Sequence, residues 1–288
     1  MPSLAIVLAL SAAAAWAIGM TTAKPGVRSM DLVTYTLGRW ILVSVLALAY
    51  ALLTHRLAFP GWVPVLYATA AGVLDSTFGG IFYLLAMERT SAHQTTTLSS
   101  TAPLWGVLGA VLVLGEPLLW TIMLAAMLVI VGSIFLTRRK QDAHPKAWLG
   151  AGFALITGVL WGFAETVPAK LALAEGMSPE TLLLVFALSG AVGMWALKPF
   201  LRRRIPRRVE PRGYFFVALS AIGGAFLGWL LWLHALSMAP ASVISPIRGS
   251  TLLFAFFYSV LFLRERPTRR ALIGIALVGC AVALVSFS

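Results

Sequence analysis

Long apolar stretches, each about the length that crosses a bilayer, follow one another along the whole chain. They are separated by short segments that carry charge, proline or glycine. The ten stretches are 3–23, 32–54, 62–87, 91–114, 118–137, 147–172, 180–200, 213–237, 241–263 and 268–287. Because a bilayer core needs roughly 20 apolar residues per helix, the pattern predicts an all-α, polytopic membrane protein with ten transmembrane helices in one bundle.

The composition agrees with this pattern and excludes several other classes. Of the 288 residues 60% are hydrophobic and 11% are charged, whereas an ordinary soluble domain has about 25% charged residues. Cys280 is the single cysteine, so no internal disulfide can form. The sequence contains no P-loop, HExxH, GxSxG or dinucleotide fingerprint and no zinc-type Cys/His spacing. We therefore expect neither an enzyme nor a bound cofactor or metal.

The basic residues are distributed unevenly between the connecting segments. Eighteen of the 22 Lys and Arg residues lie in or beside the odd-numbered connections, and only Arg56 and Lys170 lie in or beside the even-numbered ones. Positive charge marks cytoplasmic loops, so the odd connections should face the cytoplasm and both termini the opposite side of an inner membrane. This distribution accounts for the net charge of +12 without a nucleic-acid partner.

The chain also repeats itself. Residues 86–92 (AMERTSA) match residues 235–241 (ALSMAPA) at an offset of 149, and Gly79 falls on Gly228 at the same offset. Near the start of each half, the Trp16 region matches the Trp161 region at an offset of 145. The halves, 1–140 and 147–288, hold five spans each. Because five is odd, the second copy enters from the opposite side, as in the inverted repeats of secondary transporters.

These repeated motifs resemble the EamA branch of the drug/metabolite transporter superfamily. Each half has an alanine pair spaced like Ala86 and Ala92 and, further on, a glutamate followed by a proline, at Glu116 and Glu265. The resemblance implies a central cavity lined by spans 1, 3, 4, 6, 8 and 9, with spans 5 and 10 at the periphery. It also implies transport of amino acids, other metabolites, sugars or nucleotide derivatives. The second copy departs from the first, because Leu252 stands where Pro103 would match.

Two spans carry stripes of small and polar residues at helical spacing. The stripes are Thr96, Ser99, Ser100 and Pro103 in span 4, and Ser242, Ser245, Pro246 and Gly249 in span 9. Such residues can free backbone carbonyls for a ligand, or they can simply let neighbouring helices approach. Their repetition in both halves favours a substrate pathway.

Aromatic residues form a second candidate feature. Trp16 and Trp161 are repeat equivalents that lie ~20 Å deep in their spans at 1.5 Å per residue, whereas Trp120 is an interfacial anchor at a span end. Trp229 is similarly deep, and span 3 adds Phe78 and Phe82. A central aromatic cage would suit a substrate with an apolar or aromatic part, although packing against helices or lipid could also explain single residues.

Ionisable residues inside spans are functional candidates, because a charge in lipid is costly. Glu165 shares a helical face with Trp161, and Arg248 enters span 9 by about two turns. The two side chains could pair without ligand and then clamp a zwitterionic substrate, or they could form a permanent structural salt bridge. Arg39 could likewise pair with Asp75.

Four further charges lie at the ends of spans. Glu88 and Arg89, at the inner end of span 3, could gate the pathway or be solvated loop charges. Glu116 and its equivalent Glu265 each lie next to a new helix start, where first-turn capping would explain them.

These observations predict a secondary-active transporter that moves a small amphiphilic metabolite by alternating access, with efflux as the expected direction. Amino acids, aromatic ones among them, are the first substrate class. Glu165 or Asp75 could carry protons, and the chain could act as a monomer or a homodimer. Carriers of sugar-bearing, phosphate-bearing or lipid-linked substrates and a non-transporting sensor are the alternatives.

Overall fold

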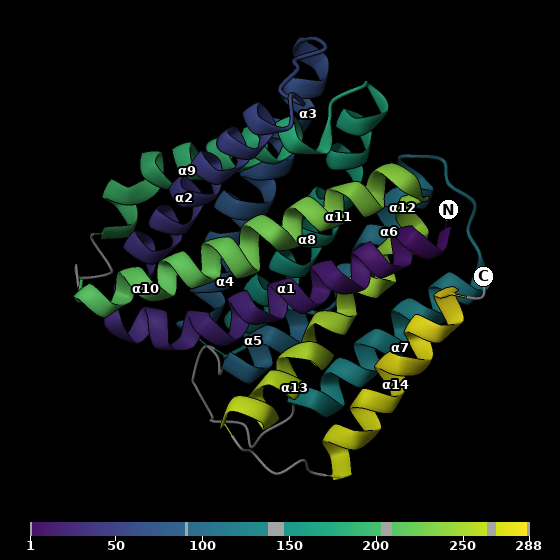
Figure 1. Ribbon diagram of the computed structural model, residues 1–288. Helices are drawn as coiled ribbons and strands as arrows, with labels where there is room; N and C mark the ends of the chain where they lie inside the picture. Colours follow the sequence, from purple (N-terminus) through teal and green to yellow (C-terminus); the bar gives the residue numbers. More distant parts are fainter. Residues whose placement is uncertain (1, 90–91, 138–146, 203–208, 264–268, 287–288) are drawn as a thin grey trace.

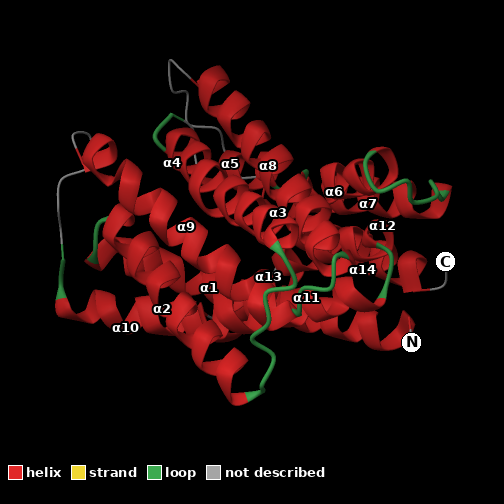
Figure 2. Ribbon diagram, turned by 90° about the horizontal axis from the view of Figure 1, so that it is seen from above, coloured by secondary structure: helices red, strands yellow, loops and turns green. Residues whose placement is uncertain are grey.

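The computed structural model describes residues 2–89, 92–137, 147–202, 209–263 and 269–286. Within these ranges all regular elements are helices, and the sole β feature is an isolated bridge between Met30 and Val209. Figure 2 shows the helices filling the molecule. The predicted all-α, polytopic fold class is confirmed.

The helices follow the predicted spans closely. In the first half they are α1 (Pro2–Ser29), α2 (Leu32–Leu53), α3 (Trp62–Gly72), η1 (Val73–Gly79), α4 (Gly80–Met87), α5 (Ala92–Ser99), α6 (Ala102–Leu112) and α7 (Trp120–Thr137). In the second half they are α8 (Ala147–Ala174), α9 (Pro179–Arg202), α10 (Pro211–Leu219), η2 (Ser220–Phe226), α11 (Leu227–Met238), α12 (Ala241–Ile244), η3 (Ser245–Gly249), α13 (Ser250–Leu263) and α14 (Arg269–Ser286).

Seven helices of the described chain are long and apolar enough to cross a membrane. Three shorter apolar helices, 102–112, 120–135 and 272–284, lie within the predicted spans 4, 5 and 10. This arrangement is consistent with ten spans, and the inverted relation of the two halves stays a prediction.

Spans 3 and 8 each contain a π-helical turn near the middle. In span 3 the turn is η1, and in span 8 it is η2, so the two copies carry it at nearly equivalent positions. Because a π turn adds a residue to the helical turn, it disturbs the regular hydrogen bonding and often marks a functional site. Asp75 lies within the first of these turns.

Spans 4 and 9 are also irregular. Span 4 is interrupted between α5 and α6 at Ser100 and Thr101, and Pro103 follows in the first turn of α6. In span 9, the 3₁₀ segment η3 contains Pro246 and ends just after Arg248. A proline has no backbone N–H to donate, so these two polar stripes lie on locally altered helix.

Spans 5 and 10 pack against each other at one side of the bundle. Figure 1 shows α7 and α14 side by side along most of their length. The contact is close because Gly132 of α7 has no side chain, and a Cβ there would lie 2.8 Å from Val278 of α14. One face of each helix is therefore already covered within the same chain.

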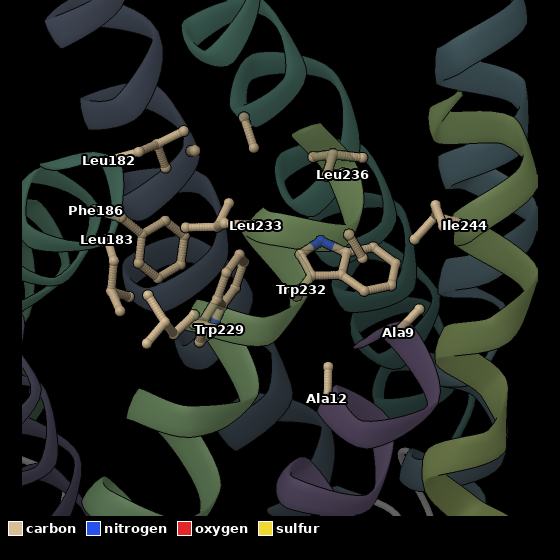
Figure 3. Close-up of a cluster of buried hydrophobic side chains, with 14 of the residues drawn as sticks. Ala9, Ala12, Leu182, Leu183, Phe186, Trp229, Trp232, Leu233, Leu236 and Ile244 are labelled. Carbon is tan, nitrogen blue, oxygen red and sulfur yellow. The ribbon is translucent and has the colours of Figure 1, made fainter. Parts of the chain in front are cut away.

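The core lies around α11. Figure 3 shows Trp229 beside Phe186 of α9, and Trp232 above Ala9 and Ala12 of α1. Trp232 is fully buried, and the ring centroids of Phe186 and Trp229 are 4.0 Å apart. Thus α11 joins helices from both halves of the sequence.

The connections gather at two ends of the bundle, which we call the basic end and the charge-poor end. At the basic end, the backbone N–H of Glu210 donates to Ser29, so the first and seventh connections meet. At the charge-poor end, Ser178 and Thr181 donate to the backbone carbonyl of Arg56, so the second and sixth connections meet. Figure 1 places both termini on the same side of the bundle as α12, which begins at the charge-poor end.

Candidate functional site

A buried ion pair lies at the centre of the candidate site. Arg248 of η3 donates from Nε and Nη2 to the two carboxylate oxygens of Glu165 of α8, the second contact measuring 2.6 Å. The Glu165 side chain is 4% exposed and that of Arg248 is 18% exposed. This two-point geometry is the strongest form of such a pair. The Glu165–Arg248 pair, which both the clamp and the structural salt bridge require, is therefore present.

Trp16 and Trp161 lie close to the same guanidinium. The Arg248 Cζ atom is 5.7 Å from the ring centroid of Trp16 and 5.6 Å from that of Trp161. Both distances fit cation–π contacts. The two indoles come from α1 and α8, so repeat-equivalent side chains meet at one charge.

Each of these indoles rests on a glycine of the opposite half. A Cβ at Gly79 would lie 2.6 Å from Nε1 of Trp161, and one at Gly228 would lie 2.4 Å from Cδ1 of Trp16. No other residue leaves room for the rings at these places. The two glycines are the pair that the sequence repeats at an offset of 149, and they are the signal that could have located these contacts in advance.

Further aromatic residues extend the group. The ring of Trp16 lies 5.7 Å from that of Trp229 and 5.3 Å from that of Trp232. On the other side, Tyr83 lies 5.2 Å from Trp161. The indole N–H of Trp232 donates to the backbone carbonyl of Glu165 at 3.0 Å. Sequence reasoning missed Trp232, although its place one turn after Trp229 puts both on the same face.

Asp75 adds a second acid. Its carboxyl group is buried and close enough to Glu165 and Arg248 for their charges to interact. Ser76 also donates to Asp75 at 3.2 Å, and the Asp75 backbone carbonyl accepts from Trp161. The Arg39–Asp75 ion pair considered from sequence is not formed within 4.0 Å in the described chain, and the Asp75 carboxyl interacts more strongly with Glu165 and Arg248 than with Arg39.

The hydroxyls of the two polar stripes are mostly bonded within their own helices. Ser99 and Ser100 both donate to the carbonyl of Thr96, and the Thr96 hydroxyl lies 3.4 Å from that of Tyr83. Ser245 donates to Ala241 and is 3.2 Å from Thr166 of α8, a residue that sequence reasoning missed. Both interpretations of the stripes, pathway and helix packing, stay open.

The remaining predicted residues lie away from the ion pair. Phe78 is 44% exposed, and Phe82 packs on Phe153 of α8 with the ring centroids 5.7 Å apart. Glu88 and Arg89 pair with each other at 3.2 Å, and Arg89 also lies over Phe153. Their proposed gating role stays a prediction. The described residues contain no group of three or more His, Cys, Asp and Glu side chains that could hold a metal.

The structure corrects the interpretation of Glu116. It was expected to cap the helix that follows it in sequence, but its carboxylate accepts from the backbone N–H groups of Ala241 and Ser242 at the start of α12. Packing of the two halves brings this more distant helix start closer, which local sequence cannot indicate. Its equivalent Glu265 lies outside the described residues.

The fold and the site together define a class. A polytopic helical membrane protein places a buried acid–base pair between aromatic residues from both halves of its sequence, as polar residues along substrate pathways are placed. The chain belongs to the EamA-like transporter family, whose model matches residues 3–138 and 148–287. The protein is therefore a multi-pass membrane protein of a transporter family.

Individual relatives agree with this assignment. An uncharacterized transporter of Archaeoglobus fulgidus is 24% identical over an alignment of 293 positions, which covers 98% of each chain. An uncharacterized transporter of Helicobacter pylori is 26% identical over 206 residues, covering 69% of this chain and 66% of the relative. A solved crystal structure with 18% identity superimposes with a TM-score of 0.81 over 98% of this chain and 96% of the other, which shows a shared fold.

Proposed function

We propose that this transporter moves a small amphiphilic zwitterion across the inner membrane by alternating access, in the efflux direction, with aromatic amino acids as the leading substrates. The observation that carries the proposal is the Glu165–Arg248 pair, which is buried and lies near Trp16 and Trp161. One acid, one base and two indoles match the three chemical parts of an aromatic amino acid.

The substrate would replace the ion pair. Its carboxylate would take the two-point contact with the Arg248 guanidinium, and its ammonium would take the Glu165 carboxylate. Because each protein charge exchanges one partner for another, neither is left buried and unpaired, which would be strongly destabilising. The substrate ring would then lie against the indoles, where aromatic contacts favour it.

Proton coupling is supported by the proximity of the two buried acids Asp75 and Glu165, whose charges interact. Two carboxylates of like charge in a buried site repel each other, which favours one proton held by the pair. A substrate ammonium arriving at Glu165 could release that proton, which would couple efflux to proton entry. The cations that interact with this pair are Arg248 and, more weakly, Arg39.

The orientation follows from the loop charges. We place the basic end in the cytoplasm and both termini on the opposite side, because the positive-inside rule applies to short loops. A cysteine at position 142, in a Cys280→Ala background, should stay unlabelled by an impermeant thiol reagent in intact cells. Labelling there would reverse the assignment. The peripheral helices α7 and α14 contact each other within the chain.

Counterflow in proteoliposomes tests the substrate class without knowledge of the driving ion. Vesicles loaded with unlabelled L-tryptophan should accumulate labelled L-tryptophan. Tryptamine, which lacks the carboxylate, and indole-3-propionate, which lacks the ammonium, should exchange at least about tenfold more slowly, because each leaves one buried charge unpaired. Equal exchange of either analogue would contradict the clamp.

Two controls sharpen this test. A sugar phosphate serves as the alternative substrate, and its exchange in place of tryptophan would assign the site to anionic metabolites bound by Arg248. Glu175→Gln and Arg56→Gln change exposed charges outside the site and should leave counterflow unchanged. Absence of exchange with every compound, in protein that remains folded, would contradict the proposed substrate class.

A further inference from the structure

Two charged residues at the charge-poor end take no part in the central site, yet each forms two hydrogen bonds to backbone groups. Glu116 lies in the connection between α6 and α7. Its two carboxylate oxygens accept from the backbone N–H groups of Ala241 and Ser242, each at 2.7 Å. The first half of the chain thus holds the start of a helix that belongs to the second half.

Lys170 of α8 holds the neighbouring helix end. Its Nζ donates to the backbone carbonyls of Leu236 at 2.6 Å and Ala239 at 2.8 Å, at the end of α11. The charges of Lys170 and Glu116 also interact with each other. An acid at a helix start and a base at a helix end both match the helix dipole. Together they hold the short connection between α11 and α12 from two sides.

This connection links two parts of the candidate site. Along α11 it leads to Trp232, and through α12 and η3 it leads to Arg248. Ser242 and Arg248 are only six positions apart, ~10 Å along α12 and the 3₁₀ segment η3 at 1.5 to 2.0 Å per residue. A displacement of this connection would therefore act close to the guanidinium that binds Glu165.

We propose that Glu116 and Lys170 form a latch, which keeps the charge-poor end closed in this conformation and must release before the central site opens there. The latch rests on the proposed alternating access. Its bonds join side chains to backbone groups that water can satisfy at a bundle end, so opening replaces protein partners by water. This makes Glu116 and Lys170 positioning residues, which act on transport through the helix that carries Arg248.

Distance measurements between spin labels test the latch without substrate. One label pair, at positions 118 and 238, lies at the charge-poor end on exposed Leu118 and Met238. A second pair, at positions 87 and 212, lies at the basic end on exposed Met87 and Arg212. Each pair joins the two halves, and both are placed in a Cys280→Ala background.

Glu116→Ala should lengthen the distance between positions 118 and 238 and shorten that between positions 87 and 212. Because two charge-assisted hydrogen bonds are lost, the ratio of closed to open molecules should fall about tenfold or more. Lys170→Met should shift both distances in the same directions, and it carries the test if Glu116→Ala does not fold. The change at the basic end is decisive, since a merely structural cap would affect the charge-poor end alone.

The exposed charges Glu175 and Arg56 provide matched controls at the same end. Glu175→Ala and Arg56→Gln should leave both distances as they are in the unmodified protein. Folded Glu116→Ala and Lys170→Met proteins with an unchanged distance between positions 87 and 212 would overturn the latch. Shifted distances without tryptophan counterflow would instead support the latch and contradict the proposed substrate.

Discussion

Two helix crossings in the molecule are built alike and differ in their charges. In one, α8 crosses span 3 and Trp161 rests on Gly79; in the other, α1 crosses span 8 and Trp16 rests on Gly228. Both crossings lie at a π turn or directly after one. The shared geometry follows from the repeat, because a ring needs a glycine beneath it in each copy.

The acids occur at the first crossing only. The charges of Asp75 and Glu165 interact there, whereas the residue 149 positions after Asp75 is Gly224, and the residue 145 positions before Glu165 is Met20. At the second crossing the helices approach so closely that a Cβ on Gly224 would lie 2.6 Å from the Cα of Gly19. One crossing is thus a polar centre, and the other is tight backbone packing.

The two halves therefore share the backbone arrangement of the crossings but differ in the charged residues that lie there. Arg248 lies near both indoles, yet it pairs with the acid of the first crossing. The repeated sequence motifs therefore locate the two crossings, and the residues that differ between the copies give only the first crossing its acids. The following variants test the separate contributions of the charged residues and of the helix crossings.

Removing the charge of Glu165 should have the largest effect on stability and transport. Glu165→Gln leaves Arg248 buried and unpaired, which typically lowers the free energy of unfolding by about 3–5 kcal/mol. Arg248→Lys should weaken transport as well, because an ammonium cannot reproduce the fork of the guanidinium. Thermal unfolding in detergent and counterflow measure the two effects.

The double variants separate a substrate clamp from a structural salt bridge. The charge swap Glu165→Arg with Arg248→Glu, or the neutral pair Glu165→Gln with Arg248→Gln, should recover part of the stability. A clamp predicts that both double variants fold but do not transport. Full transport by the doubly neutral protein would assign the pair a purely structural role.

Filling the second crossing should have the next largest effect on stability. Gly224→Ala places a methyl group against the backbone of Gly19, which cannot move aside as a side chain can, and we expect a loss of about 1–3 kcal/mol. Gly80→Ala is the matched control, since a Cβ there would meet no atom within 4 Å. Equal unfolding temperatures of the two variants would contradict the tight crossing.

Loss of an indole should reduce transport more than stability. Trp16→Ala and Trp161→Ala each remove aromatic and cation–π contacts worth about 1–2 kcal/mol, so apparent affinity should fall roughly tenfold. Trp120→Ala, which removes an indole that is 80% exposed on α7, should change neither property. If Trp16→Ala unfolds the protein but transport per folded molecule is unaffected, the ring serves packing alone.

Asp75→Asn should have the smallest effect on stability. The amide keeps the volume and can still bond Ser76, so we expect a change of about 1 kcal/mol or less. Proton coupling should be lost, because the carboxyl pair with Glu165 no longer exists. Transport driven by an imposed pH gradient measures this, with counterflow as the reference. If the response to the gradient is unchanged, the coupled proton is not carried by Asp75.

Much of the fold and part of the site could be predicted from sequence. The apolar spans determine a helical bundle in the membrane because their length and hydropathy are properties of the chain alone. The repeat located Trp16 and Trp161, since equivalent residues share a depth in a pseudo-symmetric bundle. Charges inside spans identified Glu165 and Arg248, because lipid tolerates so few of them.

Only the tertiary structure decided the partners of these residues. The Asp75 carboxyl interacts more strongly with Glu165 and Arg248 than with Arg39, and it lies in a π turn, a feature that has no reliable sequence signal. Glu116 caps α12 and not its own following helix because the fold brings the more distant helix start nearer. Hydropathy and spacing act along the chain, whereas the choice of a hydrogen-bond partner depends on which groups packing brings within about 3 Å.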